Sequence, residues 1–350
     1  KIKKIMKNKF LINNTEIQNF GKPYIIAEAC INHEGDINLA KKMIQEAKNS
    51  GADCVKFQIH NLENEMLRDT PQSDNFKETL WEALERTNFS IEKQKILKKE
   101  CEDLNIDYLC TPFSRIGADE LEEIGIEVYK IGSGELTNLP LIEHVAKKKI
   151  PMIVSTGMST IEEITDTVNL IKKIGTPLAL THCTSVYPCP YKLSNIRVIK
   201  KLNKKFNIPV GLSDHTNTIF TSLGAVAHGA CIIEKHFTLD KNAEGPDHAS
   251  SIEPNELKNL VEGSNAIFEA NGDEKKIFDE EKQILAWARE SVVSEKDIKI
   301  GEKFSLENTW VKRPSPKPGS IAAKDLNKVI GKMAKNNIKK DTQIKWEDLQ

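Results

Sequence analysis

The chain has no long hydrophobic run and few aromatic residues. Hydrophobic residues make up 39% of its 350 positions, and aromatic residues make up 6%. No apolar stretch approaches the roughly 20 residues that a membrane-spanning helix needs. The basic start, KIKKIMKNKF, lacks the apolar stretch and small-residue cleavage site of a signal peptide. We therefore expect no secretion signal and no membrane partner.

Charge of one sign and paired cysteines are also missing. The 50 Lys and Arg residues are matched by 51 Asp and Glu residues, which leaves a net charge of −1. Because no basic field surrounds such a chain, we expect no nucleic-acid partner. The 7 cysteines are scattered without a CxxC pair. This pattern predicts buried free thiols in a reducing, cytoplasmic compartment.

Short apolar runs alternate with longer helical patterns from residue 24 to about 271. The eight runs are Tyr24–Ala29, Cys54–Gln58, Asp107–Cys110, Val128–Ile131, Met152–Ser155, Leu178–Cys183, Val210–Ser213 and Cys231–Lys235. Strand–helix alternation predicts a parallel sheet. Eight units predict an α/β fold, a (β/α)₈ TIM barrel over 24–271, after an N-terminal extension over 1–23. The long segment Asn61–Ser90 is expected to form a loop with a helix near Phe76–Leu84.

A second, smaller domain is predicted at the C-terminal end. After a charged linker over 272–290, residues 297–308 align with residues 337–348, with apolar residues at matching positions. This internal repeat predicts a small β-rich domain of two similar halves over 291–350, which is too small to be very stable alone. The loop KRPSPKPG between the halves is rigid and basic. It is either an exposed linker or a lid that brings Arg313 to an anionic substrate.

Two histidines and one carboxylate follow the last two predicted strands. His215 and His236 each end an apolar run, and Asp247 follows in a Gly-Pro-Asp turn. A lone histidine is more often structural, but two at successive strand ends, beside an acid, favour metal binding or proton transfer. So few ligands do not make a closed zinc site. An open site for Mn²⁺ or Mg²⁺ fits better, with Asp247 or water completing the ligand shell.

Lys56 and Lys130 lie within apolar runs. A buried ammonium group is costly unless an anion compensates it. Because hydroxyl-bearing residues and Gly-rich turns also follow the strands, we expect a cradle for a phosphate or a phosphorylated acid. The alternatives are an internal salt bridge, such as Lys56 with Glu28, or a Schiff-base lysine.

Eight ordered motifs carry a family resemblance. They are AE with INHEG (27–35), KFQ (56–58), TPF (111–113), KIGSGE (130–135), STGM (155–158), GLSDH (211–215), EKHF (234–237) and GPD (245–247). Together they resemble the sialic acid synthase family, whose members condense phosphoenolpyruvate with an N-acylated amino sugar. The tail is similar to that family's C-terminal domain, the SAF domain related to type III antifreeze proteins. Lys312-Arg313-Pro314 matches its arginine motif.

The resemblance implies a role for each matching residue. The residues expected to bind phosphoenolpyruvate are Lys56, Thr111, Lys130, Ser133, Ser155, Ser185 and Ser213. Those expected to contact the acceptor sugar are Gln58, Phe113, Glu135, Tyr187, Asp247 and Arg313. His215 and His236 are expected to hold the metal. The expected catalytic residues are Glu28, His215, His236 and Asp247, with Glu28 or Asp247 assisting the attacking water.

The resemblance also implies a reaction and an assembly. The metal polarises the open-chain sugar aldehyde, C3 of phosphoenolpyruvate attacks it, water adds at C2, and phosphate leaves by C–O cleavage. With N-acetylmannosamine, our first-choice acceptor, the product is N-acetylneuraminate. The family further implies a domain-swapped homodimer, in which Arg313 reaches the partner's barrel and contacts the N-acyl group of the sugar.

Several motifs depart from the pattern usual in bacterial sialic acid synthases. Ser185 stands where Asn is usual, FQIH (57–60) replaces His-Gln-Thr-His, and ELTN (135–138) replaces Glu-Cys-Asn-Asn. Such differences resemble legionaminic acid synthases and animal-type relatives, so 2,4-diacetamido-2,4,6-trideoxymannose is the rival acceptor. Two further alternatives are a Schiff-base pyruvate aldolase and a non-enzymatic sugar-binding or ice-binding module.

Overall fold

The computed structural model describes residues 10–71 and 78–350. The chain divides into two compact units, Lys1–Gly272 and Asp273–Gln350. Part of the predicted extension (1–9) and the start of the helix predicted near Phe76–Leu84 lie outside the described residues. Among the residues described, no helix is both long and apolar enough to cross a membrane.

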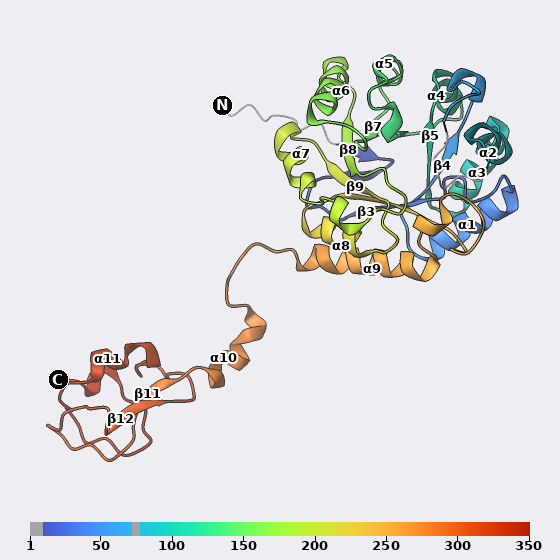
Figure 1. Cartoon of the computed structure of the whole chain (residues 1–350). Coiled ribbons are helices and arrows are strands. Elements are labelled where there is room, and N and C mark those ends of the chain that lie inside the picture. Colours follow the sequence, from blue (N-terminus) through green and yellow to red (C-terminus); the bar gives the residue numbers. More distant parts are fainter. Residues whose placement is uncertain (1–9, 72–77) are drawn as a thin grey trace. The chain divides into compact units, whose positions relative to one another are not determined.

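The first unit is an eight-stranded parallel barrel, as predicted (Figure 1). Its strands are β3 (Tyr24–Glu28), β4 (Cys54–Ile59), β5 (Asp107–Pro112), β6 (Tyr129–Ile131), β7 (Met152–Ser155), β8 (Leu178–Cys183), β9 (Val210–Asp214) and β10 (Ile232–His236). They are joined in the order β5-β4-β3-β10-β9-β8-β7-β6. Strands β5 and β6, the two ends of that order, also lie beside each other, which closes the sheet into a barrel.

Helices surround these strands (Figure 1). They are α1 (Ile37–Asn49), α2 (Leu80–Thr87), α3 (Ile91–Leu104), α4 (Arg115–Glu123), α5 (Leu139–Lys147), α6 (Ile161–Ile174), α7 (Val198–Phe206), α8 (Phe220–Ala227) and α9 (Pro254–Ala270). Short 3₁₀ turns occur at Leu62–Asn64, Ser133–Glu135, Tyr191–Leu193 and His248–Ser250. Local signals set the helix ends: Thr160 and Glu163 form a capping box at the start of α6, and Gly175 ends it in a left-handed conformation.

The inside of the barrel follows the two-residue period of a strand. Alternate residues of each strand point inward. An apolar inner layer includes Ile26, Cys54, Leu109, Val128, Ile153 and Ile232. Two positions further along the same strands come Glu28, Lys56, Thr111, Lys130, Ser155 and Glu234. The same alternation that builds the core therefore places charged and hydroxyl groups at the carboxyl end of the barrel.

A hairpin covers the apolar layer from the other end. It is formed by β1 (Phe10–Ile12) and β2 (Thr15–Ile17), which pair antiparallel. Phe10, Ile12 and Ile17 are buried and pack into the cluster that contains Ile26 and Ile232. This hairpin lies in the predicted N-terminal extension and was not itself predicted, because two three-residue strands carry too little pattern to be recognised.

The second unit has an internal near-symmetry. It contains α10 (Lys282–Ala288), β11 (Ser291–Ser294), β12 (Thr309–Lys312), α11 (Leu326–Val329), and 3₁₀ turns at Asp279–Glu281, Ala323–Asp325 and Trp346–Asp348. Ile298 and Ile338, matching residues of the two predicted halves, exchange two backbone hydrogen bonds of 2.8 Å. Phe304 and Ile344, the next matching pair, are both fully buried. The predicted β-rich domain of two similar halves is thus confirmed.

Candidate active site

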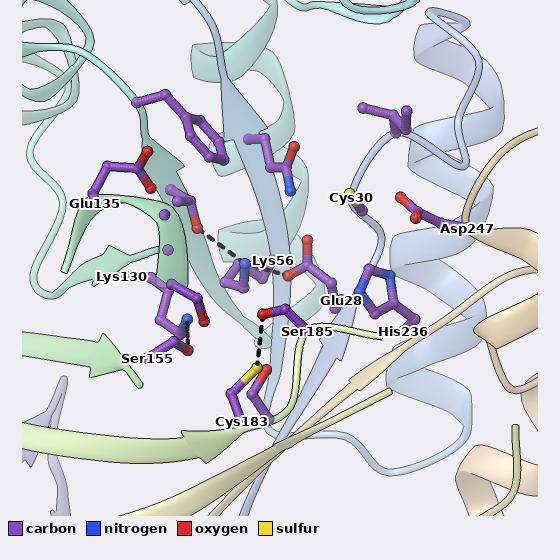
Figure 2. A pocket seen from close by; sticks show the side chains of 18 of the residues that line it. Glu28, Cys30, Lys56, Lys130, Glu135, Ser155, Cys183, Ser185, His236 and Asp247 are labelled. Carbon is purple, nitrogen blue, oxygen red and sulfur yellow. Dashed lines mark hydrogen bonds and ion pairs between the residues drawn. The ribbon is translucent and has the colours of Figure 1, made fainter. Parts of the chain in front are cut away.

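A cavity of about 510 Å³ opens at the carboxyl ends of the barrel strands, which is the usual site of chemistry in this architecture. Every residue of the first unit that we predicted for the site lines it: Glu28, Lys56, Gln58, Thr111, Phe113, Lys130, Ser133, Glu135, Ser155, Ser185, Tyr187, Ser213, His215, His236 and Asp247. Figure 2 shows how several of these side chains converge. Arg313 belongs to the second unit.

Two lysines and two glutamates form the floor of the cavity. Glu28 is level with Lys56 on one neighbouring strand and with His236 on the other. Lys56 forms an ion pair with Glu28, and its Nζ lies 3.9 Å from Oε2 of Glu234. The Nζ of Lys130 lies 3.5 Å from the same Glu234 oxygen. The salt bridge considered as an alternative for Lys56 is therefore present. Glu234, a second acid beside Lys56, was not among the predicted site residues.

Burial and charge act in opposite directions on this floor. Burial raises the pKa of Glu28, and the charge of Glu234 adds to that rise in spite of Lys56. Burial alone would also raise the pKa of Glu234, but Lys130 and Lys56 outweigh it and hold that pKa below its ordinary value. Burial lowers the pKa of Lys130. The result is one carboxylate held firmly ionised and one carboxyl group that takes up a proton more readily.

Hydroxyl groups surround the two ammonium groups. Lys56 donates to Oγ1 of Thr111 at 2.9 Å, and Lys130 donates to Oγ of Ser155 at 2.7 Å. Ser213 donates to Glu234 at 2.7 Å. A Cβ atom added to Gly157 would contact Oγ of both Ser185 and Ser133, so the chain approaches these hydroxyls as closely as only glycine allows. Lysines, hydroxyls and close backbone make a fitting cradle for a phosphorylated acid.

The two predicted metal ligands lie side by side on adjacent strands. The ring centroids of His215 and His236 are 5.3 Å apart, and Tyr187 contacts both rings, with centroids at 4.1 and 5.8 Å. Nδ1 of His215 lies 2.9 Å from the backbone oxygen of Thr184, which leaves Nε2 for another partner. Burial lowers the pKa of His236 to about 4. Neutral imidazole is the form that binds a metal.

A third potential ligand group lies beside His236. Ligand atoms of Cys30, His236 and Asp247 all lie within 4.8 Å of one another, and the three residues are buried. In Figure 2, Cys30 and Asp247 face each other next to His236. Asp247 was predicted to lie near the histidines, whereas Cys30 was predicted only to be a buried free thiol.

The opposite side of the cavity has a different character. His60 hydrogen-bonds Glu65 at 2.7 Å and Gln58 at 3.1 Å, and its ring stacks on Phe113 at 4.4 Å. Apolar residues also line the cavity: Ile31, Met66, Leu80, Leu84 and Met158. Ile31 and Leu84 belong to the same buried cluster as Cys30. None of these apolar residues was predicted for the site. Leu80 and Leu84 lie on α2 and Met66 on the segment before it, away from any strand end, whereas Ile31 and Met158 follow β3 and β7.

Glu135 makes a pH-dependent contribution to the stability of the fold. Burial raises its pKa from 4.5 to about 7, and its Oε2 has no hydrogen-bond partner among the described residues. The folded chain therefore holds a proton on Glu135 that the unfolded chain releases. The contribution of Glu135 to stability is fully present below about pH 4.5 and is lost as pH rises to about 7.

We predict that Glu135→Gln changes stability little at pH 4 and raises it at pH 8, by at most about 3 kcal/mol. The glutamine stays neutral, so it avoids the cost of a buried charge. Urea unfolding at both pH values measures the difference. Equal effects at pH 4 and pH 8 would contradict the assigned burial of a charge, and exposed Glu143→Gln on α5 serves as the control.

Known protein families match both units of the chain. Residues 43–276 match the NeuB family, and residues 289–350 match the SAF domain. The chain belongs to the NeuB family. The family predicted from the motifs is confirmed, and with it the SAF domain at the C-terminal end and the class of enzyme, a sialic acid synthase-type transferase.

Relatives of this NeuB-family chain are similar along nearly their whole length. It is 41% identical to the N,N'-diacetyllegionaminic acid synthase of Campylobacter jejuni, over 93% of this chain and 99% of that one. It is 33% identical to the N-acetylneuraminate-9-phosphate synthase of Mus musculus, over 93% and 92%. The crystal structure of N-acetylneuraminic acid synthetase from Leptospira borgpetersenii, in complex with citrate, superposes with a TM-score of 0.71 at 35% identity and covers 79% and 95% of the two chains.

Proposed function

We propose that this chain condenses phosphoenolpyruvate with the open-chain form of an N-acylated amino sugar and water, giving a nonulosonic acid and inorganic phosphate. The observation that carries the proposal is the pairing of two buried lysines with hydroxyl groups in the same cavity as the two histidines. This arrangement holds a phosphorylated acid beside a site for a Lewis acid.

Phosphoenolpyruvate is assigned to the lysine floor. Lys56 and Lys130 compensate its negative charges, while Thr111, Ser155 and Ser213 donate or accept hydrogen bonds around it. Ser133 and Ser185, at the close approach to Gly157, complete the cradle. When the C–O bond between C2 and the phosphate breaks, negative charge develops on the leaving phosphate. These fixed donors stabilise that charge without having to reorient.

Glu28 is assigned to the proton of the attacking water. It lies on the floor next to Lys56, and burial raises its pKa. A carboxyl group tuned upward in this way exchanges a proton efficiently near neutral pH. C3 of phosphoenolpyruvate forms a bond to the aldehyde carbon of the sugar, and water adds at C2 of phosphoenolpyruvate. The C–O bond between C2 and the phosphate then breaks, and inorganic phosphate leaves.

The residues present fit a divalent metal ion. Nδ1 of buried His236 has no hydrogen-bond partner among the described residues, and His215 has a second ring nitrogen available. These two histidines would hold the ion, Mn²⁺ or Mg²⁺ being the first expectation. A bound divalent ion would polarise the aldehyde oxygen of the sugar as a Lewis acid.

For the acceptor we propose 2,4-diacetamido-2,4,6-trideoxymannose. This sugar carries two acetamido methyl groups and a C6 methyl group, whereas N-acetylmannosamine has one acetamido methyl group and a C6 hydroxymethyl. The apolar wall of Ile31, Met66, Leu80 and Leu84 suits the extra methyl groups, which gain free energy when they leave water. The 41% identity to a diacetyllegionaminic acid synthase supports the same choice.

Phosphate release with a panel of acceptors tests the proposal. We expect phosphate only when phosphoenolpyruvate and a sugar are both present, with kcat/KM for the trideoxy sugar about 10–200-fold above that for N-acetylmannosamine. The reverse order would restore N-acetylmannosamine as the acceptor. No phosphate with either sugar, or with a C6-phosphorylated N-acetylmannosamine, would contradict the proposed function.

Arg313 and the homodimer are part of the same proposal. We assign Arg313, in the loop after β12, to the N-acyl group of a sugar bound by a partner copy. Arg313→Ala is expected to raise KM for the sugar far more than KM for phosphoenolpyruvate, because it removes a contact to the acceptor alone. Steady-state kinetics in both substrates measures this, with Lys317→Ala in the same loop as the control. Equal effects on both KM values would contradict the assignment.

A further inference from the structure

Cys30 adopts a backbone conformation that favours glycine. It follows β3 by two positions, and its φ angle is +47°. A residue with a Cβ atom in this left-handed region costs about 1–2 kcal/mol. Strain of this kind is retained where the surrounding structure requires it, often at a functional site. The question is therefore what a cysteine provides here that a glycine does not.

The side chain of Cys30 points into a group of metal-ligating atoms. Its sulfur, a nitrogen of His236 and an oxygen of Asp247 lie within 4.8 Å of one another. The exposed fractions of the three residues are 5%, 7% and 9%, and all three line the cavity. In the part of the chain that the structure describes, Nδ1 of His236 has no hydrogen-bond partner. A buried histidine with an unpartnered ring nitrogen, beside a thiol and a carboxylate, is an arrangement that a metal ion satisfies.

We propose that Cys30 is a thiolate ligand of the divalent ion in this site, together with His236 and Asp247. The proposal rests on the proposed function only for the task of the ion. The thiol loses its proton to solvent when the ion binds, and the sulfur–metal bond replaces the S–H bond. The ring centroid of His215 lies 5.3 Å from that of His236, but the ligand atoms of His215 are not part of the close group of Cys30, His236 and Asp247.

Two consequences follow for the chemistry of the site. Mg²⁺ prefers oxygen ligands, and sulfur favours softer ions. A thiolate ligand therefore makes Mg²⁺ a poor fit to this site and favours Mn²⁺, Co²⁺ or Zn²⁺. In addition, an Asp247 carboxylate that binds the ion is not available to take a proton from the attacking water. The proton of the attacking water is then left to Glu28, which resolves the choice that the sequence left open.

Cobalt titration of the metal-free full-length protein, without substrates, tests the proposal. A cobalt–thiolate bond produces a charge-transfer band in the near ultraviolet, and the wild type is expected to show it at one equivalent of Co²⁺. Cys30→Ser and Cys30→Gly are expected to lose the band, and to bind Co²⁺ about 10–100-fold more weakly. Glycine suits the positive φ angle, so Cys30→Gly keeps the test valid if the serine variant does not fold.

Cys183→Ser is the matched control, because Cys183 is the other buried cysteine beside a predicted ligand, with its Sγ 3.8 Å from Nδ1 of His215. This variant is expected to keep the band. The proposal is overturned if the wild type shows no band, if the band persists in both Cys30 variants, or if it disappears only in Cys183→Ser. Because the titration contains no substrate, each of these outcomes leaves the phosphate-release test of the proposed function unaffected.

Discussion

His236→Ala is expected to abolish metal-dependent phosphate release while the barrel stays folded. His236 ends β10 beside His215 and Glu28. It belongs both to the histidine pair with His215 and to the group with Cys30 and Asp247, so its removal takes a potential ligand from each. Lewis-acid stabilisation is worth several kcal/mol, so kcat is expected to fall at least about 1,000-fold. Stopped assays across a Mn²⁺ titration measure the loss, and circular dichroism and thermal unfolding measure the fold.

His215→Ala is expected to have a similar effect, since its ring lies beside that of His236. His144→Ala is the control, because His144 lies on α5, bonds Asp119 at 2.7 Å and is not part of the cavity lining. A His236→Ala enzyme that retains wild-type activity and the same response to Mn²⁺ would refute the metal assignment. A variant that merely unfolds is recognised by its circular dichroism, and His236→Gln then replaces it.

Lys130→Met is expected to damage both stability and phosphoenolpyruvate binding. The ammonium group is almost fully buried and lies 3.5 Å from Glu234, so its removal leaves the buried Glu234 carboxylate with one nearby lysine, Lys56, instead of two. Breaking a buried pair in this way costs about 3–5 kcal/mol. Loss of a fixed donor to a reacting anion lowers kcat/KM about 100- to 1,000-fold. Urea unfolding and the kinetics in phosphoenolpyruvate measure the two effects separately.

Lys235→Met is the control that separates a loss of phosphoenolpyruvate binding from the loss of a buried ion pair. Lys235 is also fully buried and lies 3.4 Å from Asp214, but it is not part of the cavity lining. Its removal is expected to destabilise the chain without raising KM for phosphoenolpyruvate in the protein that remains folded. If both variants raise that KM equally, Lys130 acts through the fold rather than on the substrate, and the assignment of the lysine floor fails.

Most of the barrel was predictable because its strands are short, largely apolar runs. A strand buried on both faces needs no polar alternation, so the predicted runs Leu178–Cys183 and Val210–Ser213 stand out against the charged helices. The hairpin of β1 and β2 was missed, because burial of Phe10 and Ile12 depends on contacts with strands far along the chain. Such contacts leave no local pattern.

The site was predictable to the extent that its residues follow strands. Lys56, Lys130 and His236 lie at inward-facing positions that the two-residue alternation defines. Glu234 shares that alternation with His236 and was nevertheless left out of the predicted set. Cys30 lies on the loop after β3, where the direction of a side chain depends on the backbone angles of single residues, and Leu84 lies on α2, which no strand-end pattern marks. Only the structure shows that Cys30 turns towards His236.

The central claim is that the cavity joins phosphoenolpyruvate to an amino sugar with cleavage of the C–O bond. The most direct measurement uses phosphoenolpyruvate labelled with oxygen-18 at the bridging oxygen, with the trideoxy sugar, N-acetylmannosamine and its C6-phosphorylated form as acceptors. The account predicts that the label leaves in inorganic phosphate, in equal amount to the nonulosonic acid formed, and that a chelator stops the reaction. Label retained in the sugar product would contradict the account. So would product formed from pyruvate in the presence of chelator with a lysine adduct trapped by borohydride.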